Sequence, residues 1–373
     1  MKKIKMVDVV SQYNRHSDEI NKEILEVIQS GNYIRGQKVS KFEDLLADYL
    51  KVNYVVSCGN GTDALQIALM SLGLNRGDEV LVPTFTFVST VEVVCLLGLV
   101  PVFLDVDEDT FLLDSSLIES HLSSKTKAII PVHLFGQCCN MYKIQSIADK
   151  YNLFIVEDAA QSIGAKYLST SSGDKFAGTI GNIGITSFYP SKNLGCFGDG
   201  GALFTNNEEL ADKIRVIANH GQRERYNYER VGVNSRLDTI QAVVLATKLK
   251  HLDTFNKSRI SSASYYNENL CQINWLKLPV SSSFSTHVFN QYSVLLSNDI
   301  DRSNFQKYLS RHNIPTMIYY PKPLHKQLAY KSYVRSSYPV SDRVSKQIIS
   351  LPMDSEITLD QIDFISRTIK KFH

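Results

Sequence analysis

The sequence predicts an α/β protein with a mostly parallel central sheet flanked by helices and a smaller α+β domain at the C-terminal end. Between residues 54 and 157, short apolar runs of strand length alternate with helical patterns. This alternation is typical of a parallel sheet that is covered on both faces. From Ser261 onward the alternation is absent. The 373 residues suffice for two domains, and we predict a large domain at 12–255 and a small one at 256–373, with residues 1–30 as a candidate to pack with the small one.

The elements that support this fold class follow in order along the chain. Two helices, separated by a break at residues 31–36, are expected in the first fifty positions. Strands are expected at 54–58, 79–82, 102–104, 127–132, 153–157, around 185, at 202–205 and at 288–296. Helices are expected to open at 59–64 and end at 74, and to cover 87–97, 141–151, 237–252, 303–312 and 359–369. Thr358 is the expected N-cap of the last helix, and Gln361 is placed to close a capping box.

Composition and charge disfavour several classes of protein. Charged residues make up 21% and hydrophobic residues 43% of the chain, as in ordinary soluble globular proteins. The net charge of +2 gives no electrostatic footprint for nucleic acid or an anionic membrane, and no apolar run is long enough to cross a bilayer. The six cysteines lack metal-ligand spacing, and no signal peptide is visible, so a reducing cytoplasm and no bound metal are expected.

One lysine lies in an unusual sequence context. An apolar strand ends near Ser187, the chain turns at Pro190, Lys192 follows, and a glycine-rich stretch at 195–201 leads into the next strand. Apolar surroundings destabilise an ammonium group and lower its pKa from about 10.4 toward neutrality. Such an amine is a nucleophile that forms a Schiff base with an aldehyde. Taken alone, the stretch fits a solvated loop lysine equally well.

Further candidate groups follow the expected strands, where parallel sheets bind their ligands. Gly61 and Thr62 open a helix whose N-terminus suits a phosphate, and Ser187 adds a hydroxyl. The stretch 83–87, with Phe85 and Phe87, offers an aromatic face for a planar ring, and Asp158 is a carboxylate that can pair with a protonated ring nitrogen. Each has an ordinary alternative in a turn, core packing or a helix cap. Together with the lysine they indicate a pocket for pyridoxal 5'-phosphate.

At these residues the chain resembles the DegT/DnrJ/EryC1/StrS group of nucleotide-sugar aminotransferases, which have the fold-type I architecture of PLP-dependent transferases. The resemblance covers nearly the whole chain. Its most specific segments lie in family order at 59–65, 157–161, 187–192 and 232–238. It implies an aminotransferase that takes its amino group from glutamate, acts on a nucleotide-linked keto-sugar, and works as a homodimer with shared active sites.

The resemblance also implies roles for individual residues. Lys192 is implied as the catalytic lysine that carries the cofactor, and Asn234 as a group that reaches the phosphate from the neighbouring subunit. Cofactor-binding roles are implied for Gly61, Thr62, Phe87, Asp158, Gln161, Ser187, Lys192 and Asn234. Asp158 would pair with the pyridine nitrogen, and Gln161 would lie near the ring hydroxyl. For His133, a pocket role and a core role are equally plausible from the sequence.

The substrate is less well defined by the sequence. Arg236 is a candidate to face a sugar carboxylate, and Tyr320 and His325 are candidates to meet the sugar or diphosphate, although an ordinary loop explains the last two nearly as well. The stretches 195–201, 220–222 and 232–236 look closest to 3-aminotransferases that act on UDP-2-acetamido-hexuluronates in O-antigen pathways. Tyr319 departs from that subgroup.

Alternative functions stay open at this point. The first is amination at C-3 or C-4 of a dTDP- or UDP-linked keto-6-deoxy sugar. A PLP-dependent sugar dehydratase is another alternative, but dehydratases that replace the lysine by histidine are disfavoured by Lys192. A PLP-binding sensor would need a DNA-reading domain for which the chain has neither the charge nor the length. A plain structural protein would not need this chemistry at the strand ends.

Overall fold

A seven-stranded sheet forms the centre of the molecule in the computed structural model, which describes residues 3–169 and 173–372. The strand order is β1-β9-β8-β5-β4-β2-β3. The strands are β1 (Tyr54–Cys58), β2 (Glu79–Pro83), β3 (Val100–Leu104), β4 (Thr126–Ile129), β5 (Phe154–Asp158), β8 (Ile183–Ser187) and β9 (Gly201–Thr205). Strand β9 runs antiparallel to β1 and β8, and the other pairs are parallel. The predicted mostly parallel sheet is therefore confirmed.

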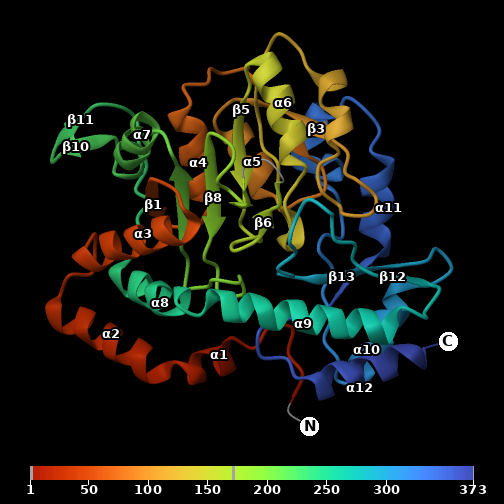
Figure 1. The fold of residues 1–373 in the computed structure, drawn as a ribbon. Coiled ribbons are helices and arrows are strands. Elements are labelled where there is room, and N and C mark those ends of the chain that lie inside the picture. The colour runs from red at the N-terminus through yellow and green to blue at the C-terminus, as the bar shows by residue number, and fades with distance from the viewer. Residues whose placement is uncertain (1–2, 170–172, 373) are drawn as a thin grey trace.

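Helices cover both faces of this sheet (Figure 1). Strand β1 shows why, because successive side chains of a strand point to opposite faces. Val55 packs in a core with α3 (Gln37–Leu50) and α8 (Thr239–Leu249), whereas Val56 packs in a second core with α4 (Gly61–Ser71) and α7 (Glu208–Ala218). The sheet is thus enclosed between two apolar layers, and its strand ends are the places where polar groups can gather.

The remaining elements of this region connect or extend the sheet. They are α5 (Ser89–Leu96), α6 (Met141–Tyr151), the strand pair β6 (Lys166–Tyr167) and β7 (Lys175–Phe176), and the hairpin β10 (Gln222–Glu224) and β11 (Asn227–Tyr228). Short 3₁₀ helices lie at Ser115–Leu117, Glu119–His121, Leu134–Gly136, Leu324–Lys326 and Leu328–Tyr333. The β10–β11 hairpin projects from the body of the molecule beside α7 (Figure 1).

A second, smaller sheet carries its own core near the C-terminal end. Its strands are β12 (Leu276–Lys277), β13 (Tyr292–Leu296) and β14 (Ile348–Leu351), and the nearby helices are α9 (Leu252–Leu270), α10 (Arg302–Arg311), α11 (Pro339–Gln347) and α12 (Leu359–Lys370). Tyr266 and Tyr292 stack in this core with ring centroids 4.7 Å apart. Helix α12 begins at a capping box formed by Thr358 and Gln361, as the sequence predicts.

The N-terminal segment contacts this smaller core. Ile4 is buried within it, the amide of Asp8 donates to Asp354 Oδ2 at 2.5 Å, and Arg15 pairs with Glu356 at 2.6 Å. Helices α1 (Val9–Arg15) and α2 (Ser17–Ser30) follow. The exact domain limits stay a prediction, because α9 runs without a break through the expected boundary at 255–256. Positions 1, 2 and 373 lie outside the described residues.

Several expected boundaries differ from the structure. The helix expected at 237–252 is two helices, α8 and α9, with Lys250 and His251 between them. Neither residue is a helix breaker, so the sequence pattern gives no sign of the break. The first fifty residues hold three helices rather than two, and β13 begins four positions after the expected start at 288. Every helix in the described ranges is too short or too polar to span a membrane.

Candidate active site

The turn that presents Lys192 is compact. After β8 ends, the amide of Lys192 donates to the carbonyl of Tyr189 at 2.8 Å, and the amide of Cys196 donates to the carbonyl of Phe188 at 2.8 Å. A Cβ atom added to Gly195 would lie 2.5 Å from the carbonyl oxygen of Pro190, so only glycine fits this close approach. The turn therefore fixes the backbone from which the lysine side chain starts.

Burial makes Lys192 an unusually weak base. It lowers the pKa of Lys192 to about 8, and the negative charge of Asp158 acts in the opposite direction. A lysine with this pKa is partly neutral near pH 7 to 8, whereas an exposed lysine is almost fully protonated. The structure thus gives Lys192 the property that a nucleophilic amine needs.

Asp158, at the end of β5, is buried with few hydrogen-bond donors. Its side chain is only 6% exposed. One oxygen accepts from the amide of Ala160 at 3.0 Å, and the other accepts a long bond of 3.4 Å from Thr90. Burial raises the pKa of Asp158, while the hydrogen bond from Ala160 and the charge of Lys192 lower it. The carboxylate therefore has capacity left for a positively charged partner.

The N-terminus of α4 closely approaches the end of β8. Asn60 caps the helix by accepting from the amide of Asp63 at 2.8 Å, and a Cβ atom on Gly61 would lie only 2.8 Å from the Cβ of Ser187. The hydroxyl of Thr62 is 2.6 Å from that of Ser89. Because the first turn of a helix leaves backbone N–H groups without intrahelical partners, this corner is suited to a phosphate.

Three further predicted residues lie together. Gln161 accepts a hydrogen bond from the amide of Phe135 at 2.7 Å and donates to the hydroxyl of Tyr320 at 3.3 Å. The ring of Tyr320 lies 6.2 Å from that of Phe87, which is 55% exposed. Burial raises the pKa of the Tyr320 hydroxyl, so it stays protonated. Phe87 therefore offers an open aromatic face beside Gln161 and Tyr320.

This set of residues fits pyridoxal phosphate. It combines an amine of lowered pKa, a buried carboxylate with spare capacity, an open aromatic ring, and a helix N-terminus that a Cβ at position 61 would obstruct. Each feature matches one part of the cofactor, namely its aldehyde, ring nitrogen, ring face and phosphate. No cluster of possible metal ligands exists within the described ranges 3–169 and 173–372.

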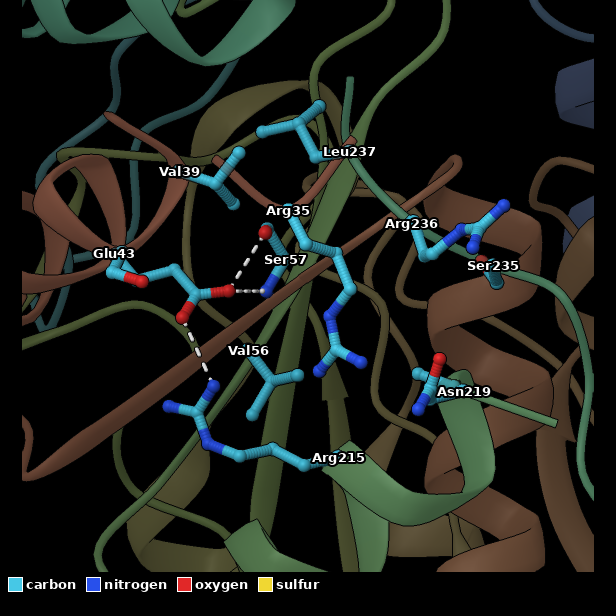
Figure 2. Close-up of a pocket in the computed structure, with 12 residues that line it drawn as sticks. Arg35, Val39, Glu43, Val56, Ser57, Arg215, Asn219, Ser235, Arg236 and Leu237 are labelled. Atoms are coloured by element: carbon cyan, nitrogen blue, oxygen red, sulfur yellow. Dashed lines mark hydrogen bonds and ion pairs between the residues drawn. The ribbon is translucent and has the colours of Figure 1, made fainter. Parts of the chain in front are cut away.

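Arg236 and Asn234 flank Ser235, whose hydroxyl accepts from the amide of Gly59 at 2.9 Å just before α4. Arg236 lines a cavity of about 280 Å³ between α3, β1 and α7, into which Arg35 also points (Figure 2). Arg215, at the same cavity, is held by Glu43 at 3.0 Å. Asn234 is exposed and bridges to Asn219. Arg236 therefore faces this cavity, and Asn234 lies at the surface of the single chain.

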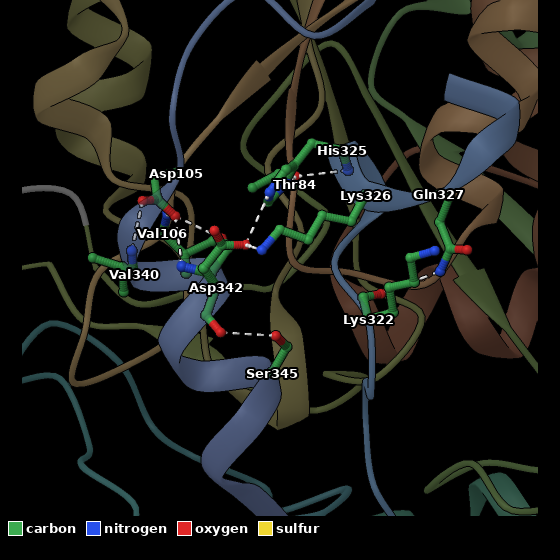
Figure 3. Close-up of polar contacts among 11 residues, drawn as sticks. Thr84, Asp105, Val106, Lys322, His325, Lys326, Gln327, Val340, Asp342 and Ser345 are labelled. Carbon is green, nitrogen blue, oxygen red and sulfur yellow. Dashed lines mark hydrogen bonds and ion pairs between the residues drawn. The ribbon is translucent and has the colours of Figure 1, made fainter. Parts of the chain in front are cut away.

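His325 has internal partners on both ring nitrogens (Figure 3). Its Nδ1 is 2.7 Å from the hydroxyl of Thr84 and its Nε2 is 3.0 Å from Asp342 Oδ1, which also binds Lys326 at 2.7 Å. The amide of Leu324 donates to the carbonyl of Thr84 at 2.8 Å. The expectation that His325 contacts the substrate is untested, but this geometry favours a role in anchoring residues 324–326 to the end of β2.

Sequence reasoning did not identify Thr84 and Thr90. Thr84 follows β2 directly, and Thr90 lies one helical turn after Phe87, so the rule of inspecting strand ends would have found both. His133, for which two explanations stood open, is a core residue. It is fully buried, its Nε2 is 2.8 Å from Glu157, and its Nδ1 accepts from the amide of Cys139.

Comparisons with known proteins identify the family of this chain. Residues 14–370 match the model of the DegT/DnrJ/EryC1/StrS aminotransferase family. The chain is 44% identical, over 97% of its length and 98% of the relative's, to UDP-2-acetamido-2-deoxy-3-oxo-D-glucuronate aminotransferase of Pseudomonas aeruginosa. A DegT DnrJ EryC1 StrS aminotransferase from Brucella abortus superposes with a TM-score of 0.92 at 42% identity, covering 99% of both chains.

A solved structure with a bound cofactor supports the assignment of pyridoxal phosphate. NtdA from Bacillus subtilis, solved with bound cofactor PMP, superposes with a TM-score of 0.90 at 31% identity, covering 100% of this chain and 86% of the other. The predicted family, fold-type I architecture and pyridoxal phosphate cofactor are confirmed. This chain belongs to the DegT/DnrJ/EryC1/StrS aminotransferase family and is a PLP-dependent sugar aminotransferase.

Proposed function

We propose that this enzyme transfers the amino group of glutamate to C-3 of a UDP-2-acetamido-3-keto-hexuluronate in the biosynthesis of a surface polysaccharide such as O-antigen. The observation that carries the proposal is the 44% identity to an aminotransferase named for a UDP-linked 2-acetamido-3-oxo-glucuronate. That match extends over 97% of the chain, so it includes the segments that supply Lys192, Arg236 and Tyr320. A cytoplasmic location belongs to the same proposal.

Lys192 is the proposed proton carrier. Pyridoxal phosphate, when bound, supplies an electron sink that stabilises negative charge on the substrate carbon. Lys192 would hold the cofactor in the resting enzyme and, once displaced by the amino donor, move a proton to and from that carbon. A pKa of about 8 suits this task, because a general base works best when its pKa lies near the working pH.

The other proposed cofactor ligands would hold the cofactor and orient its ring. Asp158 would accept a charge-assisted hydrogen bond from the protonated ring nitrogen, for which it has capacity because its present donors are few. Phe87 would cover one ring face, and Gln161 would lie beside the ring hydroxyl. Gly61, Thr62 and Ser187 would surround the phosphate at the corner between α4 and β8.

The substrate side is proposed to form between two subunits. Asn234 is exposed in the single chain, which is consistent with a role toward the site of a second copy. Arg236, two residues away and beside a cavity with two further arginines, would then supply positive charge to an anionic sugar. Tyr320 would reach the substrate from the same subunit as Lys192.

The test is to identify the aminated carbon. Enzyme loaded with an amino group by excess glutamate, and then freed of glutamate, is mixed separately with UDP-2-acetamido-3-keto-glucuronate and with dTDP- and UDP-linked keto-6-deoxy sugars. We expect one equivalent of a 3-amino product by NMR from the uronate alone. Faster amination of a 6-deoxy sugar would overturn the proposed substrate, and failure of glutamate to load the enzyme would overturn the proposed donor.

A further inference from the structure

The residue after Lys192 lies at the centre of a buried polar network. Asn193 is only 2% exposed. Its Nδ2 donates to Asn256 Oδ1 at 2.7 Å and to the carbonyl of Val288 at 3.1 Å, while its Oδ1 accepts from Asn290 Nδ2 at 2.8 Å. Both amide hydrogens and the amide oxygen of Asn193 are therefore engaged. These hydrogen bonds of Asn193 are worth most where the site is dry, because the local dielectric is low and an unpaired polar group is costly.

The network extends to the backbone that contacts Gln161. The amide of Val288 donates to the carbonyl of Gly136 at 2.8 Å, and the amide of Asn290 donates to the carbonyl of Phe135 at 2.9 Å. The amide of Phe135 in turn donates to Gln161 at 2.7 Å. The stretch 288–290 thus connects the backbone beside Lys192 to the backbone beside Gln161.

Helix α9 holds the same stretch from a third side. Arg259 is 2% exposed and donates to the carbonyls of Phe289 at 3.1 Å and Asn290 at 3.3 Å. Asn256 lies one turn earlier on the same face of α9 and also donates to the carbonyl of Ile163 at 3.1 Å. Helix α9 continues into the small core that contains Tyr266. One helix therefore links that core to the turn of the lysine.

We propose that Asn193 is a positioning residue that holds Lys192 in register with the cofactor site through Asn256 and Asn290. A lysine side chain has a long flexible stem, so the placement of its amine depends on how firmly its backbone is fixed. Asn193 fixes that backbone to α9 and to the stretch 288–290. The inference rests on the proposed role of Lys192 as the reacting amine.

The main variants are Asn193→Ala, Asn290→Ala and the double variant. The first readout uses cofactor-free protein, in which the pH dependence of Lys192 acetylation is followed by peptide mass spectrometry. The wild-type midpoint should lie at about 8. In Asn193→Ala we expect the midpoint to rise toward the ordinary lysine value, because a loosened turn lets water reach the amine. We also expect kcat to fall by roughly tenfold or more, since misplacement by about 1 Å can cost up to 10²-fold, with a smaller change in KM.

A coupling measurement separates positioning from simple destabilisation. If Asn193 acts through Asn290, the shift of the midpoint in the double variant should be no larger than in Asn193→Ala alone. The matched control is Tyr266→Phe, which removes a buried hydrogen bond of 3.0 Å to the carbonyl of Pro352 from the same helix. The control should lower Tm without moving the midpoint. Should an alanine variant fail to fold, Asn193→Ser and Asn290→Ser, which keep a hydroxyl, take its place.

The proposal is overturned if Asn193→Ala lowers Tm but leaves both the acetylation midpoint and kcat at their wild-type values. It is also overturned if the midpoint shifts of Asn193→Ala and Asn290→Ala simply add in the double variant. A preliminary experiment distinguishes this failure from failure of the proposed function. Borohydride reduction of wild-type protein with pyridoxal phosphate should attach the cofactor to Lys192. Without that attachment the assignment of Lys192 itself is wrong, whereas attachment with unaltered variants refutes only the role of Asn193.

Discussion

Two successive carboxylates at the end of β5 have opposite surroundings. Glu157 is fully buried and accepts four hydrogen bonds, from His133 at 2.8 Å and from the amides of Gly178 at 3.0 Å, Ile180 at 2.5 Å and Gly181 at 2.5 Å. Asp158, one position later and therefore on the other face of the sheet, accepts one good bond and one long bond. The first carboxylate is saturated by the protein, and the second is not.

The difference separates structure from chemistry. Because Nδ1 of His133 accepts from the amide of Cys139, its proton lies on Nε2 and is donated to Glu157. That pair has no free lone pair or proton for a ligand. Asp158 and Lys192, by contrast, interact by charge while both have shifted pKa values, which is typical of groups that act on a bound molecule.

The largest effect is expected when the reactive pair, Lys192 and Asp158, loses its amine. Lys192→Ala should lower kcat by about 10²- to 10⁴-fold, the usual contribution of a positioned proton-transfer group. Borohydride reduction followed by mass spectrometry should find no cofactor attached to the chain. Turnover within tenfold of the wild type would show that another group carries the proton.

Lys248 is the matched control for that variant. Burial also lowers the pKa of Lys248 to about 8, but its Nζ donates to the carbonyl of Gly195 at 2.7 Å and so has a structural partner. Lys248→Met should still attach the cofactor at Lys192, with a loss that appears mainly in Tm. Attachment of the cofactor to Lys248 in the wild-type protein would mean that a lowered pKa alone, without a nearby carboxylate, marks a reactive lysine in this protein.

The next effect concerns the carboxylate of the reactive pair. Asp158→Asn keeps the shape and removes the charge, so it should cost a charge-assisted hydrogen bond of about 1.5–3 kcal/mol, which is roughly 10- to 150-fold in kcat. Because the charge of Asp158 raises the pKa of Lys192, its removal should move the acetylation midpoint of Lys192 in cofactor-free protein below about 8. A midpoint that stays fixed or rises would contradict the charge interaction.

A change in the saturated pair, His133 and Glu157, should lower stability rather than turnover. Glu157→Gln places an NH₂ group among donors and leaves at least one buried group unsatisfied, which costs about 1–3 kcal/mol in the free energy of unfolding. Urea denaturation measures this loss, and kcat below the transition should match that of the wild type. A large fall in kcat with unchanged stability would place Glu157 in the chemistry and remove the distinction between the two carboxylates.

The same distinction explains what the sequence could predict. The positions of Asp158 and Ser187 at strand ends were predictable, because strands are recognisable as short apolar runs. The Thr358 cap was predictable because both partners lie within one turn. These signals are local, so a single sequence contains them.

The remaining features depend on contacts between distant positions. Gln161 and Tyr320 are 159 positions apart, and the network of Asn193 joins three segments. The break at Lys250 and His251 has no sign in the local sequence, since neither residue stops a helix by itself. Local patterns also do not show which groups contact a histidine, so the contacts of His325 with Thr84 and Asp342 appear only in the structure.

The smallest effect tests whether His325 belongs with the saturated groups. The amide of His325 donates to the Thr84 hydroxyl at 3.2 Å, and that hydroxyl can donate to Nδ1, which leaves the proton of the neutral ring on Nε2 facing Asp342. Burial lowers the pKa of His325, which favours this neutral form. Thr84→Val should therefore cost about 0.5–1.5 kcal/mol of stability.

A double-mutant cycle then decides between anchoring and substrate contact. If His325 anchors the segment, the stability losses of Thr84→Val and His325→Ala should couple by about 0.5 kcal/mol or more, as expected for contacting residues. Both single variants should then raise the KM for the sugar to a similar small extent, since Tyr320 lies only four positions before the anchored residues 324–326. If His325 instead contacts the sugar, His325→Ala alone should raise that KM while the stability losses simply add. That result would show that a histidine with partners on both nitrogens can still exchange one of them for substrate. The comparison of Glu157 and Asp158 suggests that a group saturated by the protein does not act on a ligand, and this rule would then apply to carboxylates only.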